Sequence, residues 1–139
     1  MSRPLRPGIV RLRDLAGEEE DRRRRALGAA RAATAAAETA LVAAEAALAA
    51  AAAGIGPEFH DQYQRFGAAQ GQRIAAARAA LAEARAGEEL ARTDLTAARQ
   101  RTRAMEALVE RDRTALALSQ RRRLERDVQD LVTVAPSTP

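Results

Sequence analysis

Apolar residues recur along this chain with the seven-residue spacing of coiled-coil helices. The first run ends at Ile55 and places a larger residue and an alanine, three positions apart, in each heptad: Leu27 with Ala30, Thr34 with Ala37, Leu41 with Ala44, and Leu48 with Ala51. Side chains spaced alternately three and four residues apart lie on one face of a helix. This half of the chain therefore predicts a long helix with one narrow apolar seam.

The second half repeats the arrangement. Its larger seam residues are Ile74, Leu81, Leu95, Val109 and Leu116, and the smaller ones between them are Ala77, Ala84, Ala91 and Ala98, with Met105 continuing the series. Polar Glu88 and Thr102 occupy two further seam positions. In an antiparallel pair, a large residue on one helix can face an alanine on the other, so the two backbones can approach closely. The pattern predicts two helices packed against each other.

Glycine and proline mark where these helices begin and end. The strong interior break is Gly54-Ile55-Gly56-Pro57, and proline is favoured in the first turn of a helix. We therefore expect a first helix over about 8–53, a tip at 54–57, a second helix over about 57–132 and a disordered tail at 133–139. The predicted fold is all-α, a single elongated domain (1–139) formed by two long helices in an antiparallel coiled-coil hairpin.

The register between the helices is left open by the pattern, because a heptad repeat tolerates slips of seven residues. One of the possible registers places Arg23 opposite Glu88. The apolar spacing also changes frame near both ends of the chain. Ile9, Leu12 and Leu15 precede the central seam out of frame, and Leu124, Val128 and Leu131 follow it. These outer stripes could pack more tightly there or await a partner.

The composition excludes a thick globular core and most kinds of catalytic or metal site. Hydrophobic residues make up 47% of the chain, but most of them are alanine, and only 2% of the residues are aromatic. Ala, Leu, Arg and Glu are strong helix formers. With no cysteine and one histidine, His60, the chain cannot build a thiolate zinc site or a histidine-based metal pair. We expect no enzyme activity, no cofactor, no metal and no small-molecule substrate.

The richest apolar run, Ala46 to Ala53, predicts no membrane insertion because it is far shorter than the roughly 20 residues of a span.

The charges are divided between the ends and the middle of the chain. Residues 1–31 and 99–130 each carry nine arginines, against five and six acidic residues, whereas 32–98 carry five arginines and eight acidic residues. A hairpin would bring the two basic segments together. The block from Glu18 to Arg25 consists of four acids followed by four arginines, which predicts i,i+4 pairing along one solvated helix face. No aromatic residue lies near Arg121–Arg123, so we do not expect nucleic-acid binding.

All three aromatic residues fall in the first turns of the second helix. Phe59, Tyr63 and Phe66 are spaced by four and three residues, so they share one helix face. They could cap the tip by packing over Leu48 and Ile55. They could also remain partly exposed as an anchor for a partner, because aromatic residues are enriched in interfaces. Both interpretations hold if one ring packs inward while another stays exposed.

This pattern resembles the FliJ/YscO family, the small stalk proteins of bacterial flagellar and type III secretion export. The resemblance covers nearly the whole chain and depends on the early Ile9/Leu12/Leu15 stripe, the alanine-rich heptads and the single central break. It also includes the charged ending from Met105 to Arg111 and from Arg121 to Asp127. The absence of lysine and the very alanine-rich first arm depart from a typical member.

The resemblance implies a central stalk without enzyme activity, located in the bacterial cytoplasm at the periphery of the inner-membrane export apparatus. Its termini would enter the ring of a hexameric export ATPase, its tip would reach the export gate membrane protein, and export chaperones could bind it as well. The tip residues would be Phe59, Tyr63 and Phe66. The residues facing the ATPase ring would be Ile9, Leu12, Arg11, Arg13, Arg22, Arg23, Arg24, Arg25, Arg121, Arg122, Arg123, Leu124 and Arg126.

Two other functions are alternatives to the stalk. The first is a generic coiled-coil adaptor that dimerises in trans through the same heptads. The second is an architectural nucleic-acid binder, whose affinity for DNA would fall steeply with salt.

Overall fold

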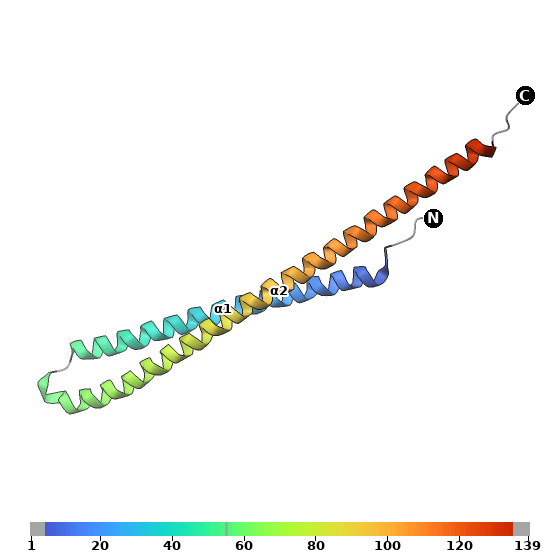
Figure 1. The fold of residues 1–139 in the computed structure, drawn as a ribbon. Helices are drawn as coiled ribbons and strands as arrows, with labels where there is room; N and C mark the ends of the chain where they lie inside the picture. The colour runs from blue at the N-terminus through green and yellow to red at the C-terminus, as the bar shows by residue number, and fades with distance from the viewer. Residues whose placement is uncertain (1–4, 55, 135–139) are drawn as a thin grey trace, which may run out of the picture. The chain divides into compact units, whose positions relative to one another are not determined.

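Two long helices account for almost all of the chain. The computed structural model describes residues 5–54 and 56–134. Helix α1 spans Pro7–Ala53, a short 3-10 turn η1 spans Pro57–Phe59, and helix α2 spans His60–Val134 (Figure 1). The described residues contain no strand. The prediction of an all-α helical hairpin is confirmed.

The helix ends differ in detail from the sequence prediction. The α-helical part of the second arm begins at His60, because Pro57 opens a 3-10 turn first. Thr133 and Val134, which the sequence placed in the tail, are helical, and the rest of that tail lies outside the described residues. Among the described residues no glycine has a positive φ, so Gly54 and Gly56 end and separate the helices without a left-handed cap.

Contacts divide the chain into two compact units. The hairpin unit contains residues 22–96. In it, the second half of α1 packs against the first half of α2, and the tip connects the two. The terminal unit contains residues 1–21 and 97–139, in which the start of α1 packs against the second half of α2. In both units the two helices run antiparallel.

The seam of the hairpin unit follows the predicted heptads. Leu27 and Thr34 are buried on α1, and Ile74, Leu81 and Leu95 are buried on α2. The interleaved alanines are half-buried, whereas their neighbours are exposed. Gln70 is also buried, although the sequence analysis did not place it in the seam. Its position seven residues before Ala77 is the signal that identifies it. Ile55 lies outside the described residues.

The terminal unit is held by a shorter seam. Ala98 and Val109 are buried on α2, and the Thr102 hydroxyl donates a hydrogen bond of 3.3 Å to the carbonyl oxygen of Ala16 on α1. On α1, Ile9 and Ala16 are half-buried, but Leu12 and Leu15 are exposed. The early apolar stripe is therefore split between the seam and the solvent.

Ion pairs between the helices show the register of the hairpin unit. The Arg85 Nη2 lies 3.6 Å from the Glu38 Oε1, and the Arg78 Nη2 lies 3.5 Å from the Glu45 Oε1. The register that would place Arg23 opposite Glu88 is wrong. Arg23 instead lies 3.5 Å from Asp94, and Glu88 lies 3.7 Å from Arg31.

One property of α1 goes beyond the sequence prediction. An 18-residue window in this helix has a mean hydropathy of 1.4, which is apolar enough to cross a membrane by length and composition, and none of that window is buried. The sequence analysis considered only the eight-residue run from Ala46 to Ala53, and this window is longer. One such helix is weak evidence for a span, because helices of soluble proteins pass the same test. Here, α1 supplies one side of a coiled-coil seam.

Candidate interaction sites

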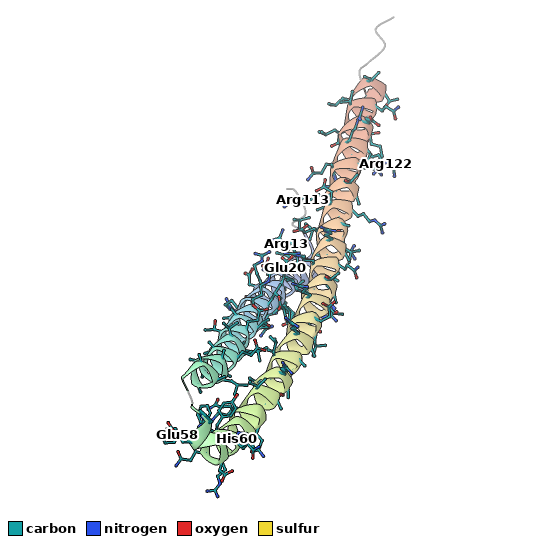
Figure 2. The ribbon with its side chains drawn as sticks, turned by 90° about the vertical axis from the view of Figure 1, so that its left-hand side faces the viewer. Arg13, Glu20, Glu58, His60, Arg113 and Arg122 are labelled. Carbon is teal, nitrogen blue, oxygen red and sulfur yellow. The ribbon has the colours of Figure 1, made fainter. Side chains whose placement is uncertain are left out.

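The last part of α2 has no helix beside it in the terminal unit. All residues from 117 to 134, which we call the bare end, are exposed. Arg6, just before the first residue of α1, forms an ion pair with Asp112 of α2. Because α1 begins beside Asp112, it does not cover the bare end. Figure 2 shows Arg122 on this uncovered part of the helix. The bare end is a helical surface available to a partner.

The bare end combines an apolar stripe with arginines. Leu124, Val128 and Leu131 have exposed fractions of 65%, 58% and 73%, and their spacing of four and three residues places them on one face. Four of the predicted partner-binding arginines also lie here: Arg121, Arg122, Arg123 and Arg126. One of them, Arg121, pairs along the helix with Glu125 at 3.5 Å. A single exposed leucine is ordinary, whereas a stripe of three beside a basic cluster is typical of an interaction surface.

A carboxylate of α2 holds the beginning of α1. The Asp112 Oδ2 accepts a hydrogen bond of 3.1 Å from the Arg6 backbone N–H, and its Oδ1 accepts one of 3.1 Å from the Arg6 Nε. The side chain of Asp112 is only 11% exposed. Since Arg6 directly precedes the first residue of α1, Asp112 acts at the helix N-terminus, where negative charge is favourable. Sequence reasoning missed this contact, although Asp112 lies seven residues after Met105.

Replacing Asp112 by Ala should loosen the start of α1. Loss of a carboxylate at a helix N-terminus costs about 1 kcal/mol. We expect a decrease of that size in the free energy of unfolding, together with faster amide hydrogen exchange in the first turns of α1. Glu110→Ala is the matched control, because Glu110 is exposed and, within residues 5–54 and 56–134, its carboxylate pairs with Arg113 on its own helix, at 3.9 Å. Equal effects of both substitutions would contradict the role assigned to Asp112.

The predicted N-terminal contacts also lie in the terminal unit. Ile9 is half-buried in the seam, whereas Arg11 and Leu12 are exposed. Arg13 donates hydrogen bonds from Nε and Nη2 to the Asp14 Oδ1, each 3.2 Å long. Arg11 and Leu12 are therefore accessible on the surface, whereas Ile9 is partly covered.

The arginines from Arg22 to Arg25 are exposed and belong to the hairpin unit. The acid–arginine block to which they belong makes contacts that its sequence did not predict. In the terminal unit, Glu20 lies 3.9 Å from Arg99, and in the hairpin unit, Arg23 pairs with Asp94. The block therefore also joins α1 to α2, rather than forming a solvated face alone.

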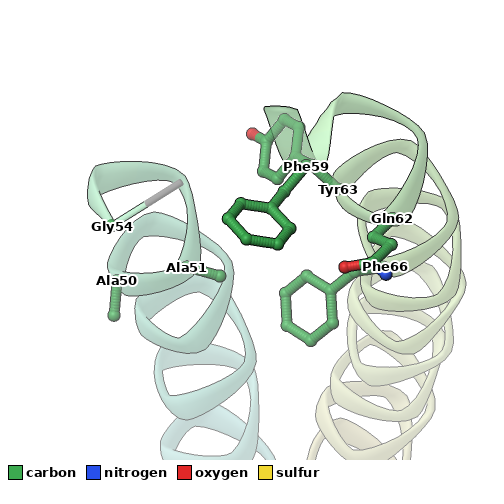
Figure 3. Close-up of a pocket in the computed structure, with 7 residues that line it drawn as sticks. All are labelled: Ala50, Ala51, Gly54, Phe59, Gln62, Tyr63 and Phe66. Atoms are coloured by element: carbon green, nitrogen blue, oxygen red, sulfur yellow. The ribbon is translucent and has the colours of Figure 1, made fainter. Parts of the chain in front are cut away.

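The three aromatic residues line a hollow at the tip. The hollow has a volume of about 480 Å³ and is closed on the α1 side by Ala50, Ala51 and Gly54. Figure 3 shows the Phe59 ring between the two helices, facing the α1 side. Phe59 is 50% exposed, Phe66 is exposed and Tyr63 is half-buried. The rings do not close the tip completely, so an apolar surface remains open there.

His60, at the start of α2, is exposed and lies 3.1 Å from Gln64, one turn along its own helix. Within the described ranges, no group of three or more His, Asp or Glu side chains could hold a metal ion. The surfaces that can act are the tip, the bare end and the helix flanks.

These features define the class of protein: an all-α coiled-coil hairpin that presents apolar and charged surfaces. The sequence profile of the family described as "Flagellar FliJ protein" matches residues 9–132. The chain belongs to the FliJ family. No curated protein and no solved structure matches the chain. Membership makes it a flagellar export stalk protein, a cytoplasmic component that associates with the export apparatus and is structural rather than enzymatic.

Proposed function

We propose that this chain is the central stalk of the flagellar export ATPase, inserting its termini into the hexameric ring and coupling the ring to the export gate. The observation that carries the proposal is the bare end. A helix that continues for 18 exposed residues beyond its partner can enter a narrow opening as a single rod. Family membership supplies the export apparatus as the setting.

The chemistry of the bare end supports insertion into a protein ring rather than free solvation. Leu124, Val128 and Leu131 would pack against apolar side chains of the ring, and the arginines would meet acidic groups. Charges around an interface mainly steer association and set the orientation, whereas the desolvated apolar anchors supply most of the affinity. Export chaperones could bind the same stalk along its sides.

The tip would act toward the export gate. Phe59, Tyr63 and Phe66 present a partly open apolar hollow, into which a side chain of the gate protein could insert. Because a half-exposed aromatic ring becomes buried on binding, such residues are frequent interface anchors.

Deleting residues 117–139 tests the role of the bare end. The deletion removes no seam residue, because the last half-buried one, Leu116, is retained. We expect the affinity for the purified hexameric export ATPase to fall at least about tenfold, since several apolar anchors are lost together. Binding is measured by surface plasmon resonance against full-length chain.

The double substitution Phe59→Ala/Phe66→Ala is the control for that deletion, because it changes the tip and leaves the bare end intact. It should bind the ATPase as the full chain does. Circular dichroism confirms that the deleted chain remains helical. Unchanged ATPase affinity after the deletion would refute the insertion of this end into the ring.

A further inference from the structure

A second stripe runs along α2 beside the seam of the terminal unit. Its members are spaced alternately three and four residues apart, and each stands one position before a place in the heptad seam. Successive residues of a helix are about 100° apart, so the stripe faces about 100° away from the seam. A helix with two such neighbouring stripes can pack against two helices instead of one. The order repeats arginine, alanine and leucine twice: Arg101, Ala104, Leu108, Arg111, Ala115 and Leu118.

The start of α1 adds two leucines to the same side of the terminal unit. Leu12 and Leu15 directly precede Arg13 and Ala16, which are half-buried. In an antiparallel pair, residues that directly follow the seam face each other across the helices, as the Arg85–Glu38 ion pair shows in the hairpin unit. Residues that precede the seam therefore share the opposite side.

The leucines from the two helices lie at neighbouring levels. The Thr102–Ala16 hydrogen bond places these two residues side by side. Leu12 is four residues from Ala16, and Leu108 is six residues from Thr102 in the same direction, so the two leucines differ by about 3 Å along the axis. By the same count Leu15 and Leu118 are about 22 Å apart, which is about four turns of a helix. We call this row the leucine flank: Leu12, Leu15, Leu108 and Leu118.

The leucine flank is open to solvent. Its four side chains have exposed fractions of 52%, 44%, 38% and 48% in the order given above. Ala104 and Ala115, which belong to the same stripe of α2, are exposed as well. Exposed leucines that stand singly are ordinary, whereas an aligned row of this length marks an interaction surface.

The α2 edge of the leucine flank is basic. Arg101 and Arg111 are exposed, and neither forms an ion pair with any residue in the ranges 5–54 and 56–134. They are ten residues apart, about 15 Å along the helix. The stripe contains no acidic residue until Glu125, which pairs with Arg121 at 3.5 Å. Two cations on this edge are therefore left for a partner to neutralise.

The α1 edge of the leucine flank is mixed in charge. Arg11 and Glu18 lie near Leu15 with opposite charges, and Asp14 accepts hydrogen bonds of 3.2 Å from Arg13. Glu19 is half-buried at the end nearer the tip and already has an interaction within the chain. The unmatched charge beside the leucines is therefore positive and lies on α2.

We propose that the leucine flank binds an amphipathic helix of a partner protein that carries acidic residues along one edge. The helix lies along α1 and α2, its apolar face contacts Leu12 and Leu108, and its carboxylates reach Arg101 and Arg111. Because the apolar contacts are desolvated, they supply most of the affinity, while the ion pairs select an acidic partner. This inference does not depend on the proposed export function, since it concerns neither the tip nor the Leu124 stripe of the bare end.

A synthetic helix tests the apolar contact. The probe is a fluorescent peptide of about 21 residues, with leucine at the heptad core positions and glutamate along one edge. Fluorescence anisotropy with the full chain should show binding whose dissociation constant rises at least about tenfold in Leu108→Gln and in Leu12→Gln. Leu90→Gln is the matched control, because it makes the same change at an exposed leucine of α2 in the hairpin unit. Circular dichroism verifies that each variant remains helical.

Arg111→Glu tests the choice of an acidic partner. The substitution should raise the dissociation constant of the glutamate peptide about tenfold and lower that of a peptide with lysine in place of glutamate. Arg103→Glu is the control, because Arg103 is exposed but follows the seam residue Thr102 and so lies on the other side of α2. The proposal is overturned if the glutamate peptide does not bind at millimolar concentration, if the lysine peptide binds the unaltered chain equally well, or if the control variants weaken binding as much as the flank variants do.

Discussion

Replacing Leu95 by Ala lowers the free energy of unfolding by about 2–3 kcal/mol, among the largest effects expected for one substitution in this chain. Leu95 is 4% exposed and is one of few large side chains in the hairpin seam. Its loss removes apolar contacts and leaves a cavity that two long helices can close only in part. For a chain of 139 residues, this corresponds to a decrease of roughly 8 °C in the midpoint of thermal unfolding followed by circular dichroism.

Leu90→Ala is the matched control for Leu95→Ala. It removes the same atoms from the same helix and the same unit, only five positions away, but Leu90 is 63% exposed. Because alanine also has the higher helix propensity, the control should change the stability by less than about 0.5 kcal/mol. Similar losses for both variants would show that the heptad seam does not hold the hairpin together.

Replacing Phe59 and Phe66 together by Ala should reduce flagellar protein export at least about tenfold if the tip engages the gate. Both rings line the tip hollow and are exposed, so the variant removes the apolar anchor from the proposed interface. Export is measured as the amount of flagellar substrate secreted by cells that carry the variant as their only copy.

Val42→Ala controls for the loss of exposed apolar surface in general. Val42 is exposed in the same unit but lies outside the tip hollow, so export should be unchanged. The unfolding midpoint of the double variant should stay close to that of the unaltered chain, because neither phenylalanine is buried. Normal export by the double variant would contradict a role of these rings in export.

The fold could be predicted from the sequence because it depends on a one-dimensional repeat. Leu81 and Leu95 fall in the heptad frame of α2, Leu27 falls in the frame of α1, and the structure buries all three. Glycine and proline at 54–57 also predict the break, since neither residue continues a helix without cost. Gln70 obeys the same frame but is polar, and the apolar pattern therefore did not include it.

The candidate sites could be predicted only in part. The sequence identified the aromatic cluster, but the hollow beside it needs Ala50, Ala51 and Gly54 from the other helix. Likewise, the stripe of Leu124, Val128 and Leu131 was visible, but its exposure depends on where α1 begins. Asp112 and Arg6, which mark that level in the terminal unit, are 106 residues apart in sequence.

The sequence by itself determined that the chain forms two amphipathic helices separated by one break, because helix propensity and heptad spacing are local properties. The tertiary structure decided the register, since a repeat of seven fits equally well after a slip of seven and only contacts such as Arg23–Asp94 and Arg31–Glu88 distinguish the alternatives. It also decided which surfaces remain uncovered. Whether a side chain is exposed or buried depends on which side chains of the other helix lie opposite to it.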